Sequence, residues 1–169
     1  VVFNARGLYG ILQGGVTSLK QPLRGCKMVP LGTMHYLAVA SADYAAKNLP
    51  HGLTPHNFRD VPFVSFNRKD DMAAEFVARA FGLKRVALSH IFVPGSEAQM
   101  RAVSAGWAVG VLPELLARSA LADGSVVNLA PGRTLPIQLY WHCWNLESAV
   151  LDALTSALTA TAETALAHA

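Results

Sequence analysis

The sequence lacks a long apolar run and a secretion signal. No stretch reaches the roughly 18 uncharged apolar residues that a membrane-spanning helix needs. The opening residues 1–4 show no basic start followed by an apolar run. These absences favour a cytoplasmic location. The first residue is valine rather than methionine, which we take as an indication of a fragment.

Charge is also sparse, at 15% charged residues and a net charge of +3. The 14 basic residues are scattered, and the longest basic runs are the pairs Arg68–Lys69 and Lys84–Arg85. A nucleic-acid-binding face concentrates its basic residues. We therefore expect that this stretch of chain does not itself contact DNA.

Signatures of catalysis and metal binding are absent as well. The sequence has no G-x-S-x-G elbow, no P-loop and no H-E-x-x-H. Cys26 and Cys143 are far apart and form no metal or redox spacing, so two free thiols are expected. Strand alternation points Cys143 and its neighbour His142 to opposite faces. Three histidines lie in an early loop-rich region without regular ligand spacing, namely His35, His51 and His56. We expect no catalytic residue, no metal and no cofactor.

What the sequence does have is alternation of strand-type runs with helical patterns, in a chain that is 52% hydrophobic. It predicts strands at 36–40, 61–66, 86–93, 108–112, 126–129 and 137–144. It predicts helices from Met72 to a stop at Gly82, from Ser96 to Gly106, from Pro113 to Arg118, and from Glu147 to about Leu166. This order indicates an α/β fold with a mostly parallel sheet and helices on both sides.

Ligands of such folds bind outside the carboxyl ends of strands and at helix N-termini. That rule selects three segments, which are residues 17–18, 67–71 and 94–96. In the second, Arg68 could hold a carboxylate with two parallel hydrogen bonds, and Asp70 and Asp71 could hold an ammonium or guanidinium group. The alternative is a solvated loop with Asp70 as helix N-cap. It is preferred for Lys69 and stays open for the others.

The other candidates have plain structural alternatives. The hydroxyls of Thr17 and Ser18 could donate to a carboxylate, or could satisfy their own turn. Backbone N–H groups at Gly95–Ser96 could bind an anion, or Ser96 could be an ordinary N-cap. Trp141 could line a cleft, although core packing is the preferred interpretation.

Short motifs spread over residues 10 to 160 share the pattern of one family. They are Gly10, Gly14 and Val16–Ser18 as G-x-x-x-G-x-V-T; Gly25 to Gly32 with Tyr36–Ser41; Pro94–Glu97; Gly106–Pro113; Leu129–Arg133; and Leu139–Trp141. Together they resemble the effector-binding domains of LysR-type transcriptional regulators. The segment Phe66–Asp71 is similar to the F-x-R-K-D-D signature of the ArgP/LysG-like branch, also called chromosome initiation inhibitors, which regulates basic amino-acid export.

The resemblance implies two Rossmann-like lobes similar to type 2 periplasmic binding proteins, with the effector between them. Lobe 1 would comprise residues 1–39 and 141–169, incomplete at its N-terminal end, and lobe 2 residues 40–140. The effector would be lysine or arginine, with Arg68 on its carboxylate, Asp70 and Asp71 favouring its cationic end, and hydroxyls donating hydrogen bonds. The ligand-binding residues would be Thr17, Ser18, Asn67, Arg68, Asp70, Asp71, Gly95, Ser96 and Trp141.

The resemblance also implies partners. Pairing into homodimers or tetramers through the effector domain is expected, whereas DNA would be bound only through a helix-turn-helix domain that this sequence does not contain. Two other functions stay open on the residues alone. One is a stand-alone binding protein or small α/β enzyme of similar two-lobed architecture, and the other is a domain whose chief role is to form dimers.

Overall fold

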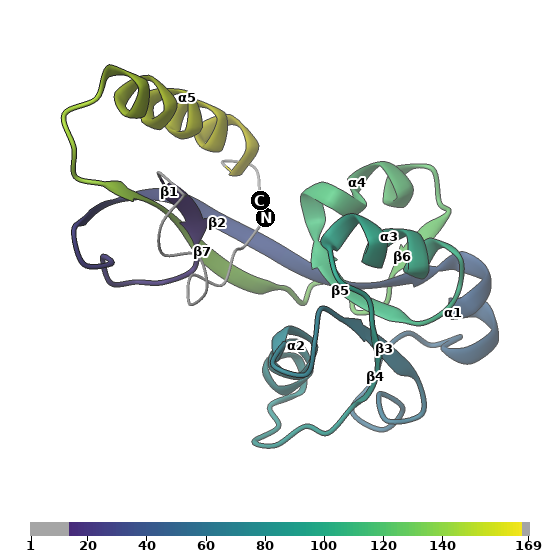
Figure 1. Ribbon diagram of the computed structural model, residues 1–169. Helices are drawn as coiled ribbons and strands as arrows, with labels where there is room; N and C mark the ends of the chain where they lie inside the picture. The colour runs from purple at the N-terminus through teal and green to yellow at the C-terminus, as the bar shows by residue number, and fades with distance from the viewer. Residues whose placement is uncertain (1–13, 167–169) are drawn as a thin grey trace. The chain divides into compact units, whose positions relative to one another are not determined.

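The computed structural model describes residues 14–166, which form two compact units. Unit 1 combines the described parts of residues 1–34 and 136–169, and unit 2 comprises His35–Leu135. The strands are β1 (Gly14–Thr17), β2 (Cys26–Ser41), β3 (Pro62–Ser65), β4 (Ser89–Phe92), β5 (Val109–Pro113), β6 (Val126–Asn128) and β7 (Leu135–Trp144). The helices are α1 (Ala42–Asn48), α2 (Met72–Phe81), α3 (Ser96–Ser104), α4 (Glu114–Ala122) and α5 (Ala149–Leu166) (Figure 1).

Unit 2 is built on a mixed sheet. The last part of β2 pairs antiparallel with β5 on one side and with β6 on the other. Beyond β5 the strands are parallel, because β3 pairs with both β5 and β4 in that sense. The carboxyl ends of β3 and β4 therefore lie side by side, with Ser65 opposite Phe92.

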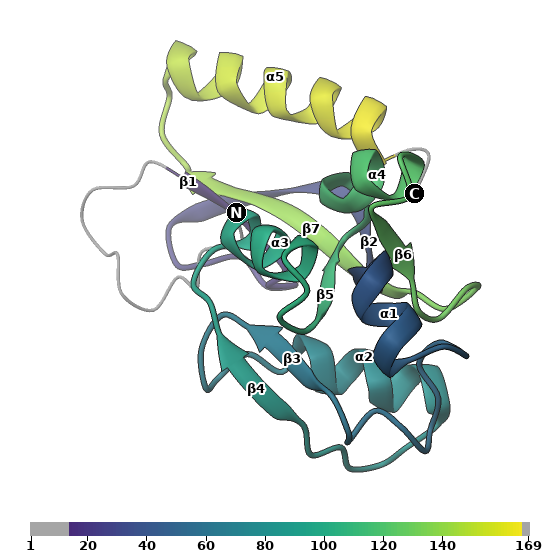
Figure 2. The same ribbon diagram turned by 90° about the vertical axis from the view of Figure 1, so that its right-hand side faces the viewer.

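Helices cover both faces of the parallel part of this sheet. Val64 belongs to a core cluster that includes Ala102 and Val103 of α3 and Ala117 of α4. Phe63 points the other way, as alternation along a strand requires, and is fully buried. Figure 2 shows α2 on the side of β3 away from α3 and α4. The buried residues of α2 are Ala73, Phe76, Val77 and Ala80.

Unit 1 is a small sheet with one long helix. β1 pairs antiparallel with β7, and β7 lies next to β2. One face packs on α5 through Trp141, Cys143 and Leu151. The indole Nε1 of Trp141 donates to Thr155 Oγ1 at 3.0 Å, and Lys27 forms an ion pair with Asp152 at 3.2 Å. The α5 residues in these contacts are Leu151, Thr155 and Asp152, whereas Val150 and Leu154 on the same helix are exposed.

The α/β class is confirmed, but the prediction of a mostly parallel sheet is wrong. β1–β7, β2–β5 and β2–β6 are antiparallel, whereas β3 pairs in parallel with β4 and β5. The prediction assumed that every strand is reached by a helical crossover. The long strands β2 and β7 instead pass from one unit into the other, and β5 enters the sheet between β2 and β3.

Several boundaries also differ from prediction. The predicted strand 36–40 is only the buried end of β2, whose half-buried first ten residues contain Pro30 and Gly32 and show no strand pattern. His35 accordingly lies in a strand rather than a loop. Helix α1 was not predicted. The predicted strand 86–93 is reduced to β4. Helix α4 continues four residues beyond Arg118.

Both predicted helix caps are shifted by one residue. The N-cap of α2 is Asp71 rather than Asp70, and that of α3 is Gly95 rather than Ser96, neither with a side-chain capping bond. The stop at Gly82 is confirmed, because this residue closes α2 in the left-handed conformation with φ 68°.

Two glycines allow the cost of a close contact to be separated from the cost of backbone strain. Gly52 has φ +74°, and a Cβ there would lie 2.5 Å from the Leu129 carbonyl oxygen. Gly124 has φ +77° and open space around it. We expect Gly52→Ala to lower the free energy of unfolding by about 2–5 kcal/mol and Gly124→Ala by about 1–2 kcal/mol. Urea denaturation followed by circular dichroism measures both, and equal losses would contradict the role of the contact.

Candidate functional site

The parallel pairing of β3 and β4 brings two of the three predicted ligand segments to one edge of unit 2. Segment 66–71 follows β3, and segment 93–95 leads from β4 into α3. The Val93 N–H donates to the Ser65 carbonyl at 2.8 Å, which extends the pairing just past the strands. Helices α2 and α3 begin directly after these segments, so their N-termini lie at the same edge.

Segment 66–71 is organised by its own side chains. The Asp70 carboxylate accepts from the Phe66 N–H at 2.7 Å and from the Met72 N–H at 3.1 Å. Asn67 Oδ1 accepts from the Lys69 N–H at 2.7 Å, and the Asn67 carbonyl accepts from the Asp70 N–H. Asp70 therefore joins the end of β3 to the first turn of α2. Its carboxylate does the work of a helix cap, as the structural alternative expected, although the N-cap position itself is Asp71.

The charged side chains on either side of Asp70 are free for other partners. Arg68 and Asp71 are exposed. Neither side chain makes a hydrogen bond or ion pair with another residue of the described range 14–166. A free guanidinium and a free carboxylate three positions apart in one loop can both bind a ligand that carries a negative and a positive charge.

Tyr36 is a residue at this edge that sequence analysis missed. It lies on β2 and is mostly buried, and its hydroxyl is close enough to Asp70 for their charges to interact. Burial, and then the Asp70 carboxylate, raise the pKa of Tyr36, so the phenol stays protonated and can donate a hydrogen bond. The sequence did carry one signal for Tyr36, because it is the one side chain with a polar tip in the apolar run 36–40.

The start of α3 offers backbone donors. Gly95 takes φ 98°, and the first-turn N–H groups that follow have no intrahelical partner by the geometry of a helix. Gln99 is buried, and its Nε2 donates to the Val93 carbonyl at 3.1 Å, which fixes the segment before the helix. Ser96 is exposed. Glu97 in the first turn opposes an anion there.

In unit 1 the predicted residues separate. Thr17 is buried, and its Oγ1 accepts from the Leu19 N–H at 3.0 Å, so the turn does satisfy its own backbone. Ser18 is exposed. Trp141 is only 5% exposed and packs beneath α5, which is the position of a core residue. Gly10 of the family motif lies outside the described residues.

The neighbours of Trp141 lie on the face of Thr17. Thr17 is opposite Tyr140 and Gly15 opposite His142 in the β1–β7 register, and side chains opposite one another share a face. The rings of Tyr140 and His142 meet edge to face at 6.4 Å. The expected separation of the two faces of β7 is confirmed, and the core packing preferred for Trp141 agrees with its burial. Tyr140 and His142, on the face of Thr17, were not among the predicted site residues.

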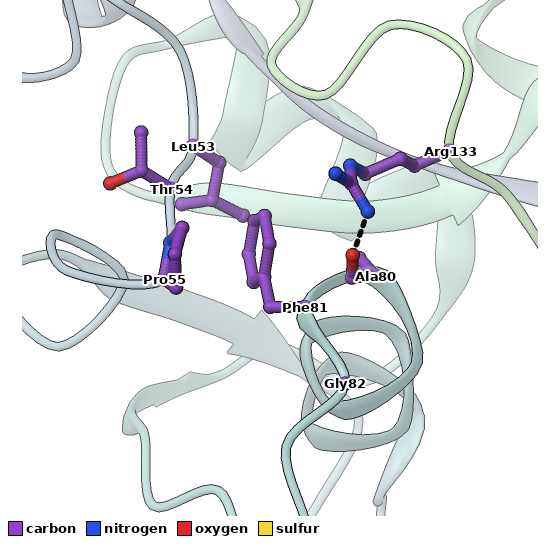
Figure 3. A pocket seen from close by; sticks show the side chains of 7 residues that line it. All are labelled: Leu53, Thr54, Pro55, Ala80, Phe81, Gly82 and Arg133. Carbon is purple, nitrogen blue, oxygen red and sulfur yellow. Dashed lines mark hydrogen bonds between the residues drawn. The ribbon is translucent and has the colours of Figure 1, made fainter.

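Unit 2 also has a hollow of about 530 Å³ at the other end of α2 (Figure 3). Leu53, Thr54 and Pro55 form one side and Phe81 and Arg133 the other. Arg133 donates to the Ala80 carbonyl, and its guanidinium carbon lies 5.3 Å from the centre of the Phe81 ring. Arg133 therefore caps the C-terminal end of α2 rather than facing a ligand.

None of the helices in residues 14–166 is long and apolar enough to cross a membrane. Groups of three or more histidine, cysteine, aspartate or glutamate side chains that could hold a metal ion do not occur in the same range.

Comparison with known proteins decides the family. The model of the LysR substrate binding domain matches residues 8–163. The chain belongs to this family. HTH-type transcriptional regulator LysG of Mycobacterium tuberculosis is 37% identical over 153 residues, which are 90% of this chain and 50% of the regulator. The LysR-family domain described here thus spans about half the length of the curated relatives it matches, and these relatives are named as transcriptional regulators.

Solved structures agree with that assignment of the LysR-family domain. ArgP from Mycobacterium tuberculosis superposes with a TM-score of 0.82 at 36% identity, covering 90% of this chain and 52% of that one. Full-length LysG from Corynebacterium glutamicum, with bound effector Arg, gives a TM-score of 0.74 at 28% identity, covering 90% and 52%. The resemblance to LysR-type regulators and to the ArgP and LysG branch is confirmed, and so is the fold expected from it.

The role of Asp70 in shaping the site can be measured against its neighbour. Asp70→Asn halves the acceptors available to two backbone N–H groups and removes the charge, so the free energy of unfolding should fall by about 1–2 kcal/mol. Asp71→Asn removes the same charge from an exposed side chain and should cost about 0.5 kcal/mol. Urea titrations of both variants make the comparison. A loss at Asp71 as large as that at Asp70 would show that charge alone matters.

The cap supplied by Arg133 gives a second matched pair. Arg133→Ala removes the bond to the Ala80 carbonyl and the contact with Phe81, and should lower the free energy of unfolding by about 1–2 kcal/mol. Arg79→Ala removes an exposed positive charge from the last turn of the same helix and should cost about 0.5 kcal/mol. Thermal and urea unfolding report both values. Indistinguishable variants would rule out a specific contribution of the Arg133 contacts.

Proposed function

We propose that this chain is the effector-sensing part of a LysR-type transcriptional regulator and that its effector is a basic amino acid, arginine or lysine. The observation that carries the proposal is the edge of unit 2, where exposed Arg68 and Asp71 flank a loop fixed by Asp70 beside the start of α3. The LysG structure with bound effector Arg supports the choice of ligand class.

The charges at this edge suit a zwitterion with a cationic tail. The planar guanidinium of Arg68 matches a carboxylate through two parallel hydrogen bonds. The carboxylate of Asp71 attracts the cationic end. The first-turn N–H groups of α3 at Gly95 and Ser96 add donors for the carboxylate. In this proposal Asn67 and Asp70 shape the loop and contact the ligand little, because their polar atoms already bind the backbone.

Residues of unit 1 complete the proposed set. Thr17 and Ser18 are proposed to donate hydrogen bonds to the effector through their hydroxyls. Trp141 contributes by packing under α5, where its indole N–H is already bound to Thr155. We propose that residues 1–39 and 141–169 form the first lobe of the sensor and that residues 40–140 form the second.

The wider role is proposed from the relatives, of which this chain covers half. Effector binding would shift the population of conformations of the sensor, and the regulator would pass that shift to DNA-binding domains elsewhere in it. The same proposal includes pairing through the effector domain into dimers or tetramers. It also includes a location in the cytoplasm, where the DNA lies.

Isothermal titration calorimetry with L-arginine and L-lysine tests the ligand. Saturable heat is expected for at least one of them with the folded chain. Arg68→Gln should weaken binding about tenfold or more, because a charged bidentate partner of the carboxylate is lost. Lys69→Gln is the matched control, with the same charge change at the adjacent exposed position, and should stay within about twofold.

Two results would contradict this proposal. One is the absence of heat with both amino acids in a sample whose circular dichroism shows a folded protein. The other is equal weakening by Arg68→Gln and Lys69→Gln, which would reduce the effect to overall charge.

A further inference from the structure

A buried histidine on β7 has one ring nitrogen without a partner. His142 is 2% exposed, and its Nδ1 makes no hydrogen bond with any residue of the described range. Buried polar atoms are nearly always hydrogen-bonded, so an unpaired one needs a reason. An apolar side chain of similar size would fill the same space without leaving an unsatisfied atom. The bond made by the other ring nitrogen supplies that reason.

Nε2 of His142 lies 3.1 Å from the carbonyl oxygen of Leu19. A carbonyl oxygen only accepts hydrogen bonds, so Nε2 must carry the proton and donate it. In the neutral ring this leaves Nδ1 as the unprotonated acceptor. The contact with Leu19 thus requires a proton on Nε2 and leaves Nδ1 without a partner among the described residues.

Leu19 is held from both sides of its backbone. Its carbonyl accepts from His142, and its N–H donates to Thr17 Oγ1 at 3.0 Å. Ser18 lies between these two anchored residues and is itself exposed. Glycine at position 15, directly opposite His142 in the register, presents no side chain that competes with the imidazole for space on this face. The strand pairing of β1 with β7 ends at Thr17, and the imidazole of His142 fastens the residues just beyond it to β7.

We propose that His142 is a positioning residue for effector binding, which holds the Thr17–Leu19 turn through the Leu19 carbonyl so that the Thr17 and Ser18 hydroxyls keep a fixed geometry. This inference rests on the proposed function, since it takes the effector to be a basic amino acid. His142 acts through the turn and does not touch the ligand. Its buried, unsatisfied Nδ1 is the consequence of using Nε2 for that purpose.

Two amide substitutions separate the ring nitrogens. The glutamine amide nitrogen reaches about as far as Nε2, whereas that of asparagine reaches only as far as Nδ1. His142→Gln should therefore keep the bond to Leu19 and bind L-arginine within about twofold of the parent chain, and His142→Asn should bind about fivefold more weakly, as expected when one ordering hydrogen bond is lost. Calorimetry measures both affinities.

A core control distinguishes positioning from stability. Cys143→Ala alters the adjacent residue of β7 on the opposite, α5-packed face, and it lowers stability without touching the turn. It should leave the arginine affinity within about twofold while its unfolding midpoint falls. An affinity loss in Cys143→Ala equal to that in His142→Asn would overturn the proposal, as would equal losses in the glutamine and asparagine variants.

A spectroscopic measurement does not depend on any variant folding. Nitrogen-15 NMR of the imidazole in the parent chain should show a proton on Nε2, and a ring protonated only at Nδ1 would overturn the assignment. A parent chain that binds neither arginine nor lysine would contradict the proposed function. The NMR result would then still decide whether His142 holds Leu19, so the two failures can be told apart.

Discussion

The arrangement of unit 2 depends on the parallel pairing of β3 with β4. With Ser65 opposite Phe92, two strand ends coincide, and so do the loops and helix starts that follow them. The pairing is continued by the bond from Val93 to Ser65. A slip of one residue would turn Phe63 and Val64 to the wrong faces, where each would lose its buried surroundings. The core on both faces of β3 thus fixes the position of the polar loop, although no core residue touches it.

The sequence allowed much of this to be predicted, for reasons that can be named. Helix α2 was recognised from the spacing of Met72, Phe76, Val77 and Ala80 and from Gly82, since both signals are local. The mixed sheet was not recognised, because the direction of β5 and the continuation of β2 through Pro30 and Gly32 depend on pairing between distant segments. The caps at Asp71 and Gly95 were missed by one residue. An N-cap is defined by the backbone angles of the cap residue itself, which composition does not reveal.

The candidate site was predictable to a similar degree. Chain order placed segments 67–71 and 94–96 after neighbouring strands, and the structure brings them to one edge. Tyr36 was missed since its approach to Asp70 joins β2 to a loop thirty-four positions later in the chain. Trp141 was predictable in part, because core packing was its preferred interpretation and the residue is buried under α5. Alternation correctly set it apart from His142, but size alone could not say which face of β7 is covered by α5.

The polar residues of the candidate site, together with His142, fall into two groups according to whether their side-chain atoms already bind the backbone. Asp70, Asn67, Thr17 and His142 each use an oxygen or nitrogen on a backbone group within their own unit. Ser18, Arg68, Asp71 and Ser96 are exposed beside them. A flexible charged side chain loses conformational entropy when it binds a ligand, and a backbone already fixed by its neighbours does not add to that loss. The first group therefore limits the entropy cost of binding, and the second group supplies the charges and hydroxyls that select the ligand.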